Sequence, residues 1–238
     1  MNKILITGGS RGIGADMVRY FCEKGYKVAF TYKSSKKEAD SLSKETGAFA
    51  ICADSANESE VISAVKAAEE FCSGIDALIN NAAISSFSLF TDIKTEDWKR
   101  IFDVNVNGAY YYTREVLPKM IEKKQGRIIN ISSMWGISGA SCEVHYSATK
   151  AALIGMTKAL AKELGPSKIT VNCIAPGVID TDMNKSLSEN DRNALIDETP
   201  VCRLGTARDI SRVAYFLCED ASDFITGQVL SVDGGFII

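Results

Sequence analysis

The sequence predicts an α/β fold in which a parallel sheet of about seven strands is covered by helices on both faces. Short apolar runs alternate with longer amphipathic segments along all 238 residues. Right-handed crossovers place a helix between successive parallel strands, and strands covered on both faces are apolar almost throughout. No repeat or Pro/Gly-rich linker marks a boundary, so we expect residues 1–238 to form a single doubly wound domain.

The predicted strands are the short apolar runs, at 4–6, 27–31, 48–52, 77–79, 127–131, 170–173 and 229–232. The predicted helices are the longer segments, near 12–24, 36–45, 57–72, 105–123, 146–164 and 207–219. Residues 180–203 interrupt this alternation because they are polar and poor in strand formers. Connections of this length are uncommon unless they have a function, so we expect a mobile lid. An ordinary surface excursion is the alternative.

Composition excludes several classes of protein. The chain is 46% hydrophobic and 24% charged, which is typical of a globular protein. Its 27 basic and 30 acidic residues give a net charge of −3, so we expect neither nucleic acid nor a membrane as a partner. No apolar run approaches the ~20 residues of a membrane span, and no signal peptide opens the chain. Seven widely spaced cysteines without a CxxC pair predict unpaired thiols in the cytoplasm and no metal site.

A glycine-rich turn follows the first predicted strand and opens the first predicted helix. Glycine lets a backbone turn sharply and approach a pyrophosphate, and the free N–H groups of a helix N-terminus attract that anion. The spacing departs from G-x-G-x-x-G, and a plain tight connection is the alternative. Its position favours a dinucleotide site in a Rossmann-like fold. The residues expected to contact the dinucleotide here are Gly8, Ser10, Arg11, Gly12, Ile13 and Gly14.

The residues after the second strand predict NADP(H) in preference to NAD(H). In a dinucleotide fold, an acidic residue roughly 20 residues beyond the turn binds the adenosine ribose. No carboxylate occurs here until Glu38. Arg11 and Lys33 can instead bind a 2′-phosphate through charge-assisted hydrogen bonds. The alternative is that Lys33, with Lys36 and Lys37, only begins a solvated helix.

Two further segments follow predicted strands at the edge where ligands bind in open α/β sheets. Asp54 follows the third strand, where it can accept a hydrogen bond from an adenine amino group or cap the next helix. Asn81 and Ala82 follow the fourth strand, and small residues there permit close backbone approach. We expect all three residues to contact the cofactor.

A serine, a tyrosine and a lysine suggest the chemistry. Ser133 follows the fifth strand, and Tyr146 and Lys150 are four residues apart on a predicted helix, so they share one face. A nearby ammonium group stabilises phenolate, which predicts a lowered pKa for Tyr146. Tyr146 can then exchange a proton with a substrate oxygen that Ser133 holds. A Y-x-x-x-K pair is common by chance, and only its position in the chain gives it weight.

These residues together resemble the short-chain dehydrogenase/reductase family along essentially the whole chain. The matching motifs are Thr7-Gly8-xxx-Gly12-x-Gly14, Asn80-Asn81-Ala82, the Ser133/Tyr146/Lys150 triplet and Pro176-Gly177. The resemblance implies hydride transfer between a nicotinamide and a carbonyl carbon, with Tyr146 as general acid in reduction. It adds Asn105 as a fourth catalytic residue. It also implies cofactor contacts from Tyr146, Lys150, Pro176, Gly177, Ile179 and Thr181. Ala83 is a departure, because glycine is usual there.

Within the family, residues 126–133, 169–177 and 225–235 resemble the 3-oxoacyl-(acyl-carrier-protein) reductases. That resemblance implies NADPH-dependent reduction of a carrier-bound carbonyl in fatty acid synthesis. An acidic carrier protein would need positive charge beside the cleft. The candidates are Lys119, Lys123, Lys124, Arg127 and Lys168, and solvated helix ends are the alternative.

Trp135 and Glu143 favour another substrate. Both lie between Ser133 and Tyr146, and an aromatic wall with a carboxylate suits a cationic amine. This stretch is similar to bacterial reductases that act on a 5-aminopentanone adduct of elongation factor P. The alternative is that Glu143 faces solvent and Trp135 only packs a loop. A regulator that binds NADP(H) without turnover is a third possibility, although the intact Ser133, Tyr146 and Lys150 argue against it.

The predicted helix 146–164 is apolar on more than one face. One face should pack on the sheet and another on a neighbour. The family resemblance implies a homotetramer that pairs through helices 105–123 and 146–164 and is completed by the C-terminal region, whose apolar end, Phe236-Ile237-Ile238, fits such burial. His145, the only histidine, is turned about 100° from Tyr146 on the helix, which predicts a surface or interface role.

Overall fold

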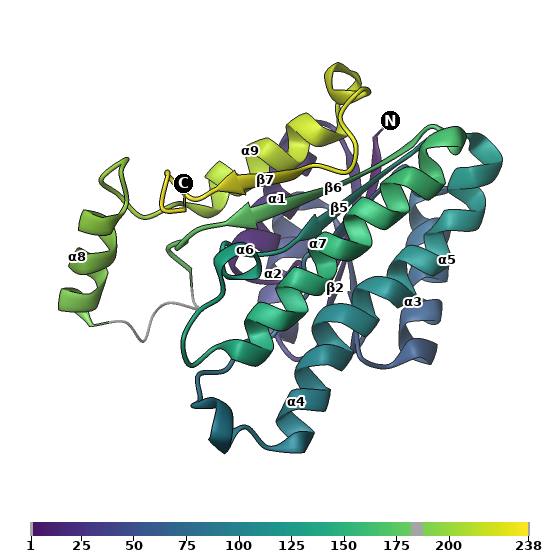
Figure 1. Ribbon diagram of the computed structural model, residues 1–238. Coiled ribbons are helices and arrows are strands. Elements are labelled where there is room, and N and C mark those ends of the chain that lie inside the picture. The colour runs from purple at the N-terminus through teal and green to yellow at the C-terminus, as the bar shows by residue number, and fades with distance from the viewer. Residues whose placement is uncertain (1, 182–187, 238) are drawn as a thin grey trace.

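The computed structural model describes residues 2–181 and 188–237. One seven-stranded parallel sheet runs through it in the order β3-β2-β1-β4-β5-β6-β7, with helices on both faces (Figure 1). The predicted fold class is therefore confirmed. The strands are β1 (Lys3–Ile6), β2 (Lys27–Tyr32), β3 (Phe49–Cys52), β4 (Ala77–Asn80), β5 (Gly126–Ile131), β6 (Ile169–Pro176) and β7 (Val229–Val232).

All six predicted helices are present, with ends displaced by no more than a few residues. Three others, α4, α6 and α8, were not predicted. The α-helices are α1 (Gly12–Glu23), α2 (Lys36–Thr46), α3 (Glu58–Cys72), α4 (Thr95–Phe102), α5 (Gly108–Lys123), α6 (Trp135–Ser138), α7 (Val144–Leu164), α8 (Glu189–Glu198) and α9 (Ala207–Cys218). None of the helices in the described part of the chain is both long and apolar enough to cross a membrane.

Two hydrophobic cores form because successive side chains of a strand point to opposite faces of the sheet. In β1, Ile4 and Ile6 pack in the core beneath α1, α2 and α9, while Leu5 packs in the core beneath α3, α5 and α7. All three side chains are fully buried. Each such burial contributes about 1.5–3 kcal/mol to stability.

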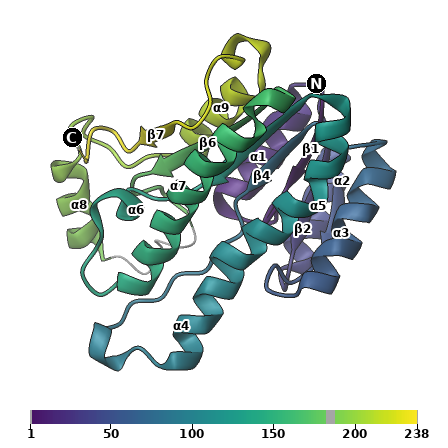
Figure 2. The ribbon, with the colours of Figure 1, turned by 45° about the vertical axis from the view of Figure 1, so that its right-hand side comes forward.

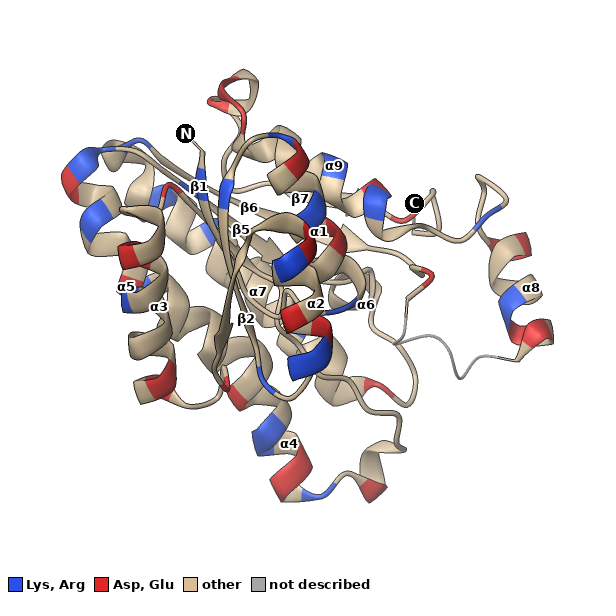
Figure 3. Ribbon diagram, turned by 180° about the vertical axis from the view of Figure 1, so that it is seen from behind, with Lys and Arg blue, Asp and Glu red and all other residues tan. Residues whose placement is uncertain are grey.

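Charged residues are confined to the helices, turns and strand ends that surround this sheet. Figure 3 shows basic and acidic positions interspersed over the helices, while the strands are almost free of charge. This mixture of signs is expected from the small net charge of the chain.

The strand order reverses between β1 and β4, and this reversal opens a crevice at the carboxyl edge of the sheet. The chain after β1 turns toward β2, whereas the chain after β4 leaves on the other side. Thr7 begins the first of these loops and donates its N–H to the carbonyl oxygen of Ile79 at 3.0 Å. The glycine-rich turn therefore lies beside the segment that begins at Asn81.

A π-helical stretch, Asp103–Asn107, joins α4 to α5 and makes a long continuous helical segment (Figure 2). Asn105 lies within it and is 1% exposed. The sequence had indicated a helix starting at this residue. The helical segment instead begins before Asn105. This residue therefore lies in the interior of the segment, and its side chain does not cap a helix end.

Part of the predicted lid, 180–203, is described. Residues 182–187 lie outside the described residues. After them comes α8, whose first turn is capped by the hydroxyl of Ser188, accepting the N–H of Asp191 at 3.2 Å. Arg192 on this helix pairs with Asp180. The function of the segment as a lid stays a prediction.

Candidate active site

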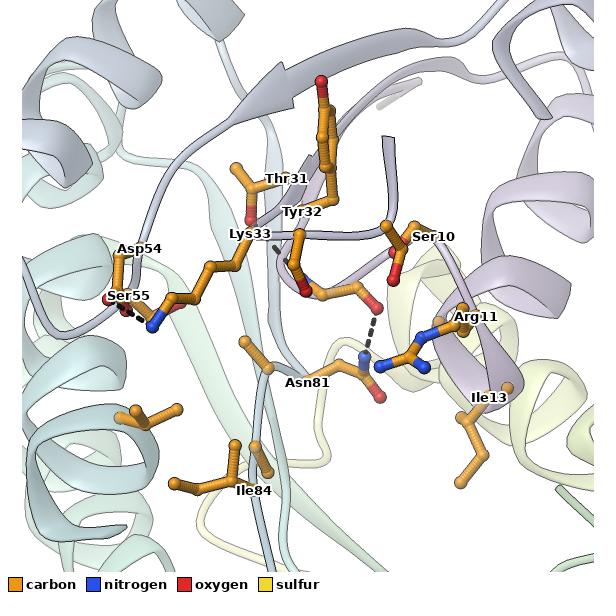
Figure 4. Close-up of a pocket in the computed structure, with 18 of the residues that line it drawn as sticks. Ser10, Arg11, Ile13, Thr31, Tyr32, Lys33, Asp54, Ser55, Asn81 and Ile84 are labelled. Atoms are coloured by element: carbon orange, nitrogen blue, oxygen red, sulfur yellow. Dashed lines mark hydrogen bonds and ion pairs between the residues drawn. The ribbon is translucent and has the colours of Figure 1, made fainter. Parts of the chain in front are cut away.

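A cavity of about 630 Å³ lies at the carboxyl edge of the sheet, beside β1 and β4 (Figure 4). This volume lies within the range of ligand pockets, about 300–1,000 Å³. Eleven residues predicted to bind the cofactor line it: Gly8, Ser10, Arg11, Gly12, Ile13, Gly14, Lys33, Asp54, Asn81, Ala82 and Thr181. The other predicted cofactor residues, Tyr146, Lys150, Pro176, Gly177 and Ile179, lie outside this lining.

Close packing explains the glycines of the turn. Gly8 has a φ of +64°, and a Cβ at this position would come within 2.8 Å of the Cα of Ala82. A Cβ on Gly14 would meet the carbonyl oxygen of Gly8 and lie 2.7 Å from the amide nitrogen of Asn81. Any larger residue would therefore push the turn away from the segment after β4.

Thr7 and Asn81 hold this turn against the loop after β4. The hydroxyl of Thr7 accepts the backbone N–H groups of Asn81 and Ala82, each at 2.9 Å. In return, the side-chain amide of Asn81 donates to the carbonyl oxygens of Thr7 at 2.9 Å and Gly8 at 3.1 Å (Figure 4). The side chain of Asn81 therefore fixes the turn on one side of the cavity.

The first turn of α1 fits a pyrophosphate. Arg11 occupies the position before this helix, and no side chain caps it. The N–H groups of the first turn are therefore available, and the helix dipole adds positive potential there. With the close backbone approach permitted by glycine, the residues present fit a bound dinucleotide.

Asp54 lies at the opposite end of the cavity and forms two ion pairs. Its carboxylate is 2.8 Å from the ammonium of Lys33 and 2.9 Å from the guanidinium of Arg100. It also accepts the N–H of Ala56 at 3.1 Å. Partial burial opposes ionisation, but these hydrogen bonds outweigh it and hold the pKa of Asp54 below its usual value. Asp54 is therefore an acceptor at the end of the cavity predicted for the adenine.

The environment of Lys33 differs from the expectation that it is free to meet a 2′-phosphate. Figure 4 shows its side chain crossing to Asp54, with Arg11 reaching into the cavity from the other side. No ion pair to Arg11 occurs within the described residues. Arg11 is also shared with a second, adjoining cavity of about 430 Å³ that contains Lys37. Of the two cations expected to bind a 2′-phosphate, Arg11 is the one that has no acidic partner among the residues that the structure describes.

Ser133, Tyr146 and Lys150 come together at the carboxyl edge of β5. Tyr146 and Lys150 share the inner face of α7, with the Lys150 nitrogen 5.5 Å from the centre of the Tyr146 ring. The Ser133 hydroxyl lowers the pKa of the Tyr146 phenol, although burial of the phenol outweighs this effect. Lys150 is 2% exposed and donates to the carbonyl oxygen of Ile131 at 2.8 Å. The predicted common face is confirmed.

The pKa of Tyr146 departs from the sequence expectation. Burial raises it to about 12, which exceeds the lowering effect of the Ser133 hydroxyl, and the carboxylate of Glu143 raises it further. Burial also lowers the pKa of Lys150 to about 8. The expected lowering of the phenol pKa by lysine was wrong because it did not include the cost of burying both charges in the protein interior.

Asn105 and Thr149 connect this group to the loop after β4. The amide of Asn105 donates to the carbonyl oxygen of Ile84 and accepts the N–H of the same residue, both at 2.9 Å. It also donates to the hydroxyl of Thr149 at 3.0 Å, which donates to the carbonyl oxygen of Tyr146 at 2.7 Å. Asn105 therefore acts on the turn of α7 that carries Tyr146, and it does not contact Lys150 directly.

Trp135 and Glu143 lie beside the catalytic group. The backbone N–H of Trp135 donates to the Ser133 hydroxyl at 3.1 Å, and the side chain is half-buried. Glu143 is also half-buried, and its burial raises the pKa of its carboxyl group. No ion pair to Glu143 occurs within the described residues. Its negative charge raises the pKa of Tyr146.

The basic residues expected beside the cleft lie at the other edge of the sheet. Ser133 follows the carboxyl end of β5, whereas the basic residues lie at or just before the amino ends of β5 and β6, or in the last turns of α5. A six-residue strand spans about 20 Å. Within one chain, these residues therefore do not flank the cleft. They are Lys119, Lys123, Lys124, Arg127 and Lys168.

Several of these basic side chains also have acidic partners. Arg127 is 4% exposed and forms an ion pair with Asp223. Lys119 pairs with Glu69 at 2.6 Å. Arg127 therefore belongs to the protein interior, and the sequence did not reveal this because its partner is 96 residues away.

The expected surface position of His145 was wrong. The residue is 1% exposed, and its Nε2 lies 2.5 Å from the hydroxyl oxygen of Ser86. Ser86 belongs to the loop after β4, so this bond holds the loop against the start of α7. The rotation of about 100° between successive helical residues does place His145 and Tyr146 on different faces of α7. Both side chains are nevertheless buried.

Sequence analysis missed three residues that shape the site: Arg100, Thr149 and Gly136. No sequence pattern pointed to Arg100, because it lies on α4, which was not predicted. Its ion pair with Asp54 joins this helix to the loop after β3. Thr149 lies between Tyr146 and Lys150 in the chain, and this position could have marked it as a residue of the site. A Cβ on Gly136 would lie 2.6 Å from the Ser132 hydroxyl and 2.8 Å from the backbone of Lys150.

Comparisons with known proteins agree with this geometry. A family model described as "Enoyl-(Acyl carrier protein) reductase" matches residues 8–237. A 3-oxoacyl-(acyl-carrier-protein) reductase of Chlamydia muridarum is 41% identical, covering 97% of this chain and 95% of the relative. The reductase of that name from Staphylococcus epidermidis is 38% identical and covers 99% of both chains. A short-chain dehydrogenase/reductase mutant from Serratia marcescens is similar in structure, with a TM-score of 0.93 and 33% identity, covering 99% of this chain and 97% of that chain.

We predict that Gly136→Ala lowers the free energy of unfolding by about 1–3 kcal/mol, because the added methyl group overpacks the contact between α6 and Lys150. Urea unfolding measures this change. Gly165→Ala is the control, since a Cβ there has no atom within 4 Å. Equal stability of the two variants would contradict the tight contact at Gly136.

Proposed function

This chain belongs to the short-chain dehydrogenase/reductase family, and we propose that it uses NADPH to reduce a carbonyl group to an alcohol. We further propose that the substrate is a 3-oxoacyl group on acyl carrier protein, in fatty acid synthesis. The names of the relatives from Chlamydia muridarum and Staphylococcus epidermidis support this substrate. The observation that carries the reductase proposal is the cluster of Ser133, Tyr146 and Lys150 beside the glycine-lined cavity.

The chain's residues would handle the proton of this reaction. Bound NADPH supplies the hydride. Tyr146 is protonated at neutral pH, because its pKa is raised to about 12, so it can donate to the carbonyl oxygen. The Ser133 hydroxyl accepts the Trp135 N–H, which leaves its own proton free for the same oxygen. The Lys150 ammonium then stabilises the phenolate left on Tyr146.

A second candidate function rests on Glu143. A half-buried carboxylate without an ion pair in the described residues, next to the catalytic phenol, suits a substrate that carries a positive charge. An acyl thioester offers no such charge. This observation favours reduction of the 5-aminopentanone group on elongation factor P as the alternative.

The deciding experiment incubates the purified chain and NADPH in parallel with acetoacetyl-carrier protein and with ketone-modified elongation factor P. We expect Tyr146→Phe to lower the rate on the preferred substrate about 10²–10⁴-fold, because it removes the proton donor. Glu143→Gln should lower the rate on the amine substrate only. Equal rates for the native chain and Tyr146→Phe, including absence of activity in both, would favour the non-catalytic NADP(H)-binding regulator.

NADPH is proposed as the cofactor because Arg11, without an acidic partner among the described residues, faces the cavity. We predict that Arg11→Ala lowers kcat/KM for NADPH about tenfold and leaves that for NADH nearly unchanged, since a charge-assisted bond to a 2′-phosphate is lost. Lys33→Ala should act less selectively, because Lys33 pairs with Asp54. Steady-state kinetics with both cofactors measures the difference. A native preference for NADH would refute the assignment.

The pH dependence of the reduction rate should follow the protonation state of Lys150. Its pKa is lowered from 10.5 to about 8, so the ammonium is present below this pH and lost above it. Tyr146 keeps its proton throughout this range. We therefore predict that kcat for reduction falls as the pH rises above about 8, and that Lys150→Arg moves this fall to higher pH. A flat profile up to pH 9.5 in both proteins, with the fold intact, would show that the Lys150 charge is not required.

We also propose a homotetramer in which α7 contributes to pairing. Small residues at Ala151, Gly155 and Ala159 lie one helical turn apart on an exposed face of α7. Such a face allows close approach of another helix. This position agrees with the apolar second face that the sequence indicated.

We predict that Gly155→Arg produces smaller assemblies without unfolding the chain, because a Cβ there meets no atom within 4 Å of the same chain. Light scattering at micromolar concentration measures the mass, and circular dichroism measures the fold. Lys158→Ala on the same helix is the control. A native chain that is already monomeric would contradict the proposed pairing.

A further inference from the structure

Residues 233–237, which we name the hook, follow β7 and fold back toward the catalytic group. Asp233 holds the hook in place with both carboxylate oxygens. Oδ1 accepts the N–H of Gly235 at 3.0 Å, and Oδ2 accepts the N–H of Ile237 at 3.1 Å. Gly234 and Gly235 have φ values of +69° and +85°, which let the chain reverse direction. Phe236 lies between the two bonded residues, Gly235 and Ile237, and its position is thereby fixed.

The hook packs tightly on the segment predicted to contact the nicotinamide. A Cβ on Gly177 would lie 2.6 Å from the Cα of Asp233, so the two backbones are in contact. The N–H of Gly177 also donates to the carbonyl oxygen of Val232 at 3.0 Å. Any displacement of the hook would therefore also move the predicted cofactor segment after β6.

The hook also contacts the end of the predicted lid. The carbonyl oxygen of Gly234 accepts the N–H of Val201 at 3.2 Å. A Cβ on Gly234 would lie 2.6 Å from Val201 and 2.7 Å from Thr199, and one on Gly235 would lie 3.2 Å from Pro200. In Figures 1 and 2, the end of the described chain lies beside the segment that follows α8.

The third contact reaches the catalytic group. The rings of Phe236 and Trp135 meet edge to face, with centroids 6.0 Å apart and planes at 87°. Trp135 is two residues from Ser133 and donates its N–H to the Ser133 hydroxyl. Both rings are half-buried. Phe236 therefore packs on a side chain whose own backbone is bonded to Ser133.

We propose that Phe236 is a specificity-determining residue, which acts by holding the indole of Trp135 as one wall of the substrate pocket. The proposal rests on the proposed reductase function. The aromatic pair of Phe236 and Trp135 would pack against the acyl part of a ketone substrate. Without the Phe236 ring, Trp135 loses its support, and a short substrate loses a wall that a longer acyl chain can partly replace.

Kinetics with acetoacetyl and 3-oxooctanoyl thioesters tests this proposal. We expect Phe236→Ala to raise KM for the acetoacetyl thioester about fivefold with kcat nearly unchanged, because the contact is made equally in the ground and transition states. The increase for the longer thioester should be smaller. Phe236→Tyr should retain the native KM because it keeps the ring. Phe224→Ala is the control, since that aromatic side chain is fully exposed.

Fluorescence provides a readout that does not require turnover. The chain has two tryptophans, so Trp98→Phe leaves Trp135 as the only emitter. In this background, Phe236→Ala should shift the emission to longer wavelength and weaken thioester binding measured by quenching, and Phe224→Ala should do neither. A fall in kcat with unchanged KM would show that Phe236 serves the chemical step and would overturn the proposal.

The outcomes separate the two proposals. A native chain that neither binds nor reduces either thioester rejects the proposed function, and the specificity proposal fails with it. An active native chain whose KM, binding and emission are unaffected by Phe236→Ala rejects the specificity proposal alone.

Discussion

The burial of one ammonium group determines the chemical character of this site. Lys150 lies beneath the carboxyl edge of β5 and donates to the carbonyl oxygen of Ile131, with almost no contact with solvent. The same interior that lowers the pKa of Lys150 raises that of Tyr146, so the phenol keeps its proton while the lysine is charged only below about pH 8. A buried phenol next to a cation is a proton donor whose conjugate base has a stabilising partner already in place.

Two sets of hydrogen bonds align this chemistry with the cofactor cavity. Thr7 and Asn81 join the glycine turn to the loop after β4, and Asn105 joins the same loop to α7 through Ile84 and Thr149. The loop after β4 is thus fixed from both sides. Because the connecting groups are backbone amides and short side chains, their positions have little rotational freedom. The distance between the glycine turn and the Tyr146 phenol is therefore set by the loop to which both are bonded.

The sequence predicted the sheet well because its central strands are buried on both faces and mostly apolar, although the edge strands β3 and β7 are partly exposed. It also predicted the glycine turn that lines the cavity and the common face of Tyr146 and Lys150, because spacing along the chain determines both. It missed α4, which is only eight residues long, and α8, which is mostly polar and has weak apolar periodicity. The environments of Lys33 and Arg127 depend on partners that are distant in the chain, and the direction of the Tyr146 pKa shift depends on burial. None of these three properties is encoded in neighbouring residues.

The π-helical stretch at Asp103–Asn107 has a consequence for how this chain can vary. A π turn accommodates one more residue than a regular α-helical turn, and it lies between α4, which carries Arg100, and α5. Deleting a single residue there would turn the π turn into a regular α-helical turn, and the helices on either side would largely keep their register. Asn105, however, would lose its two hydrogen bonds with Ile84. The extra residue of the π turn is therefore what lets the interior of a continuous helix hold the loop after β4.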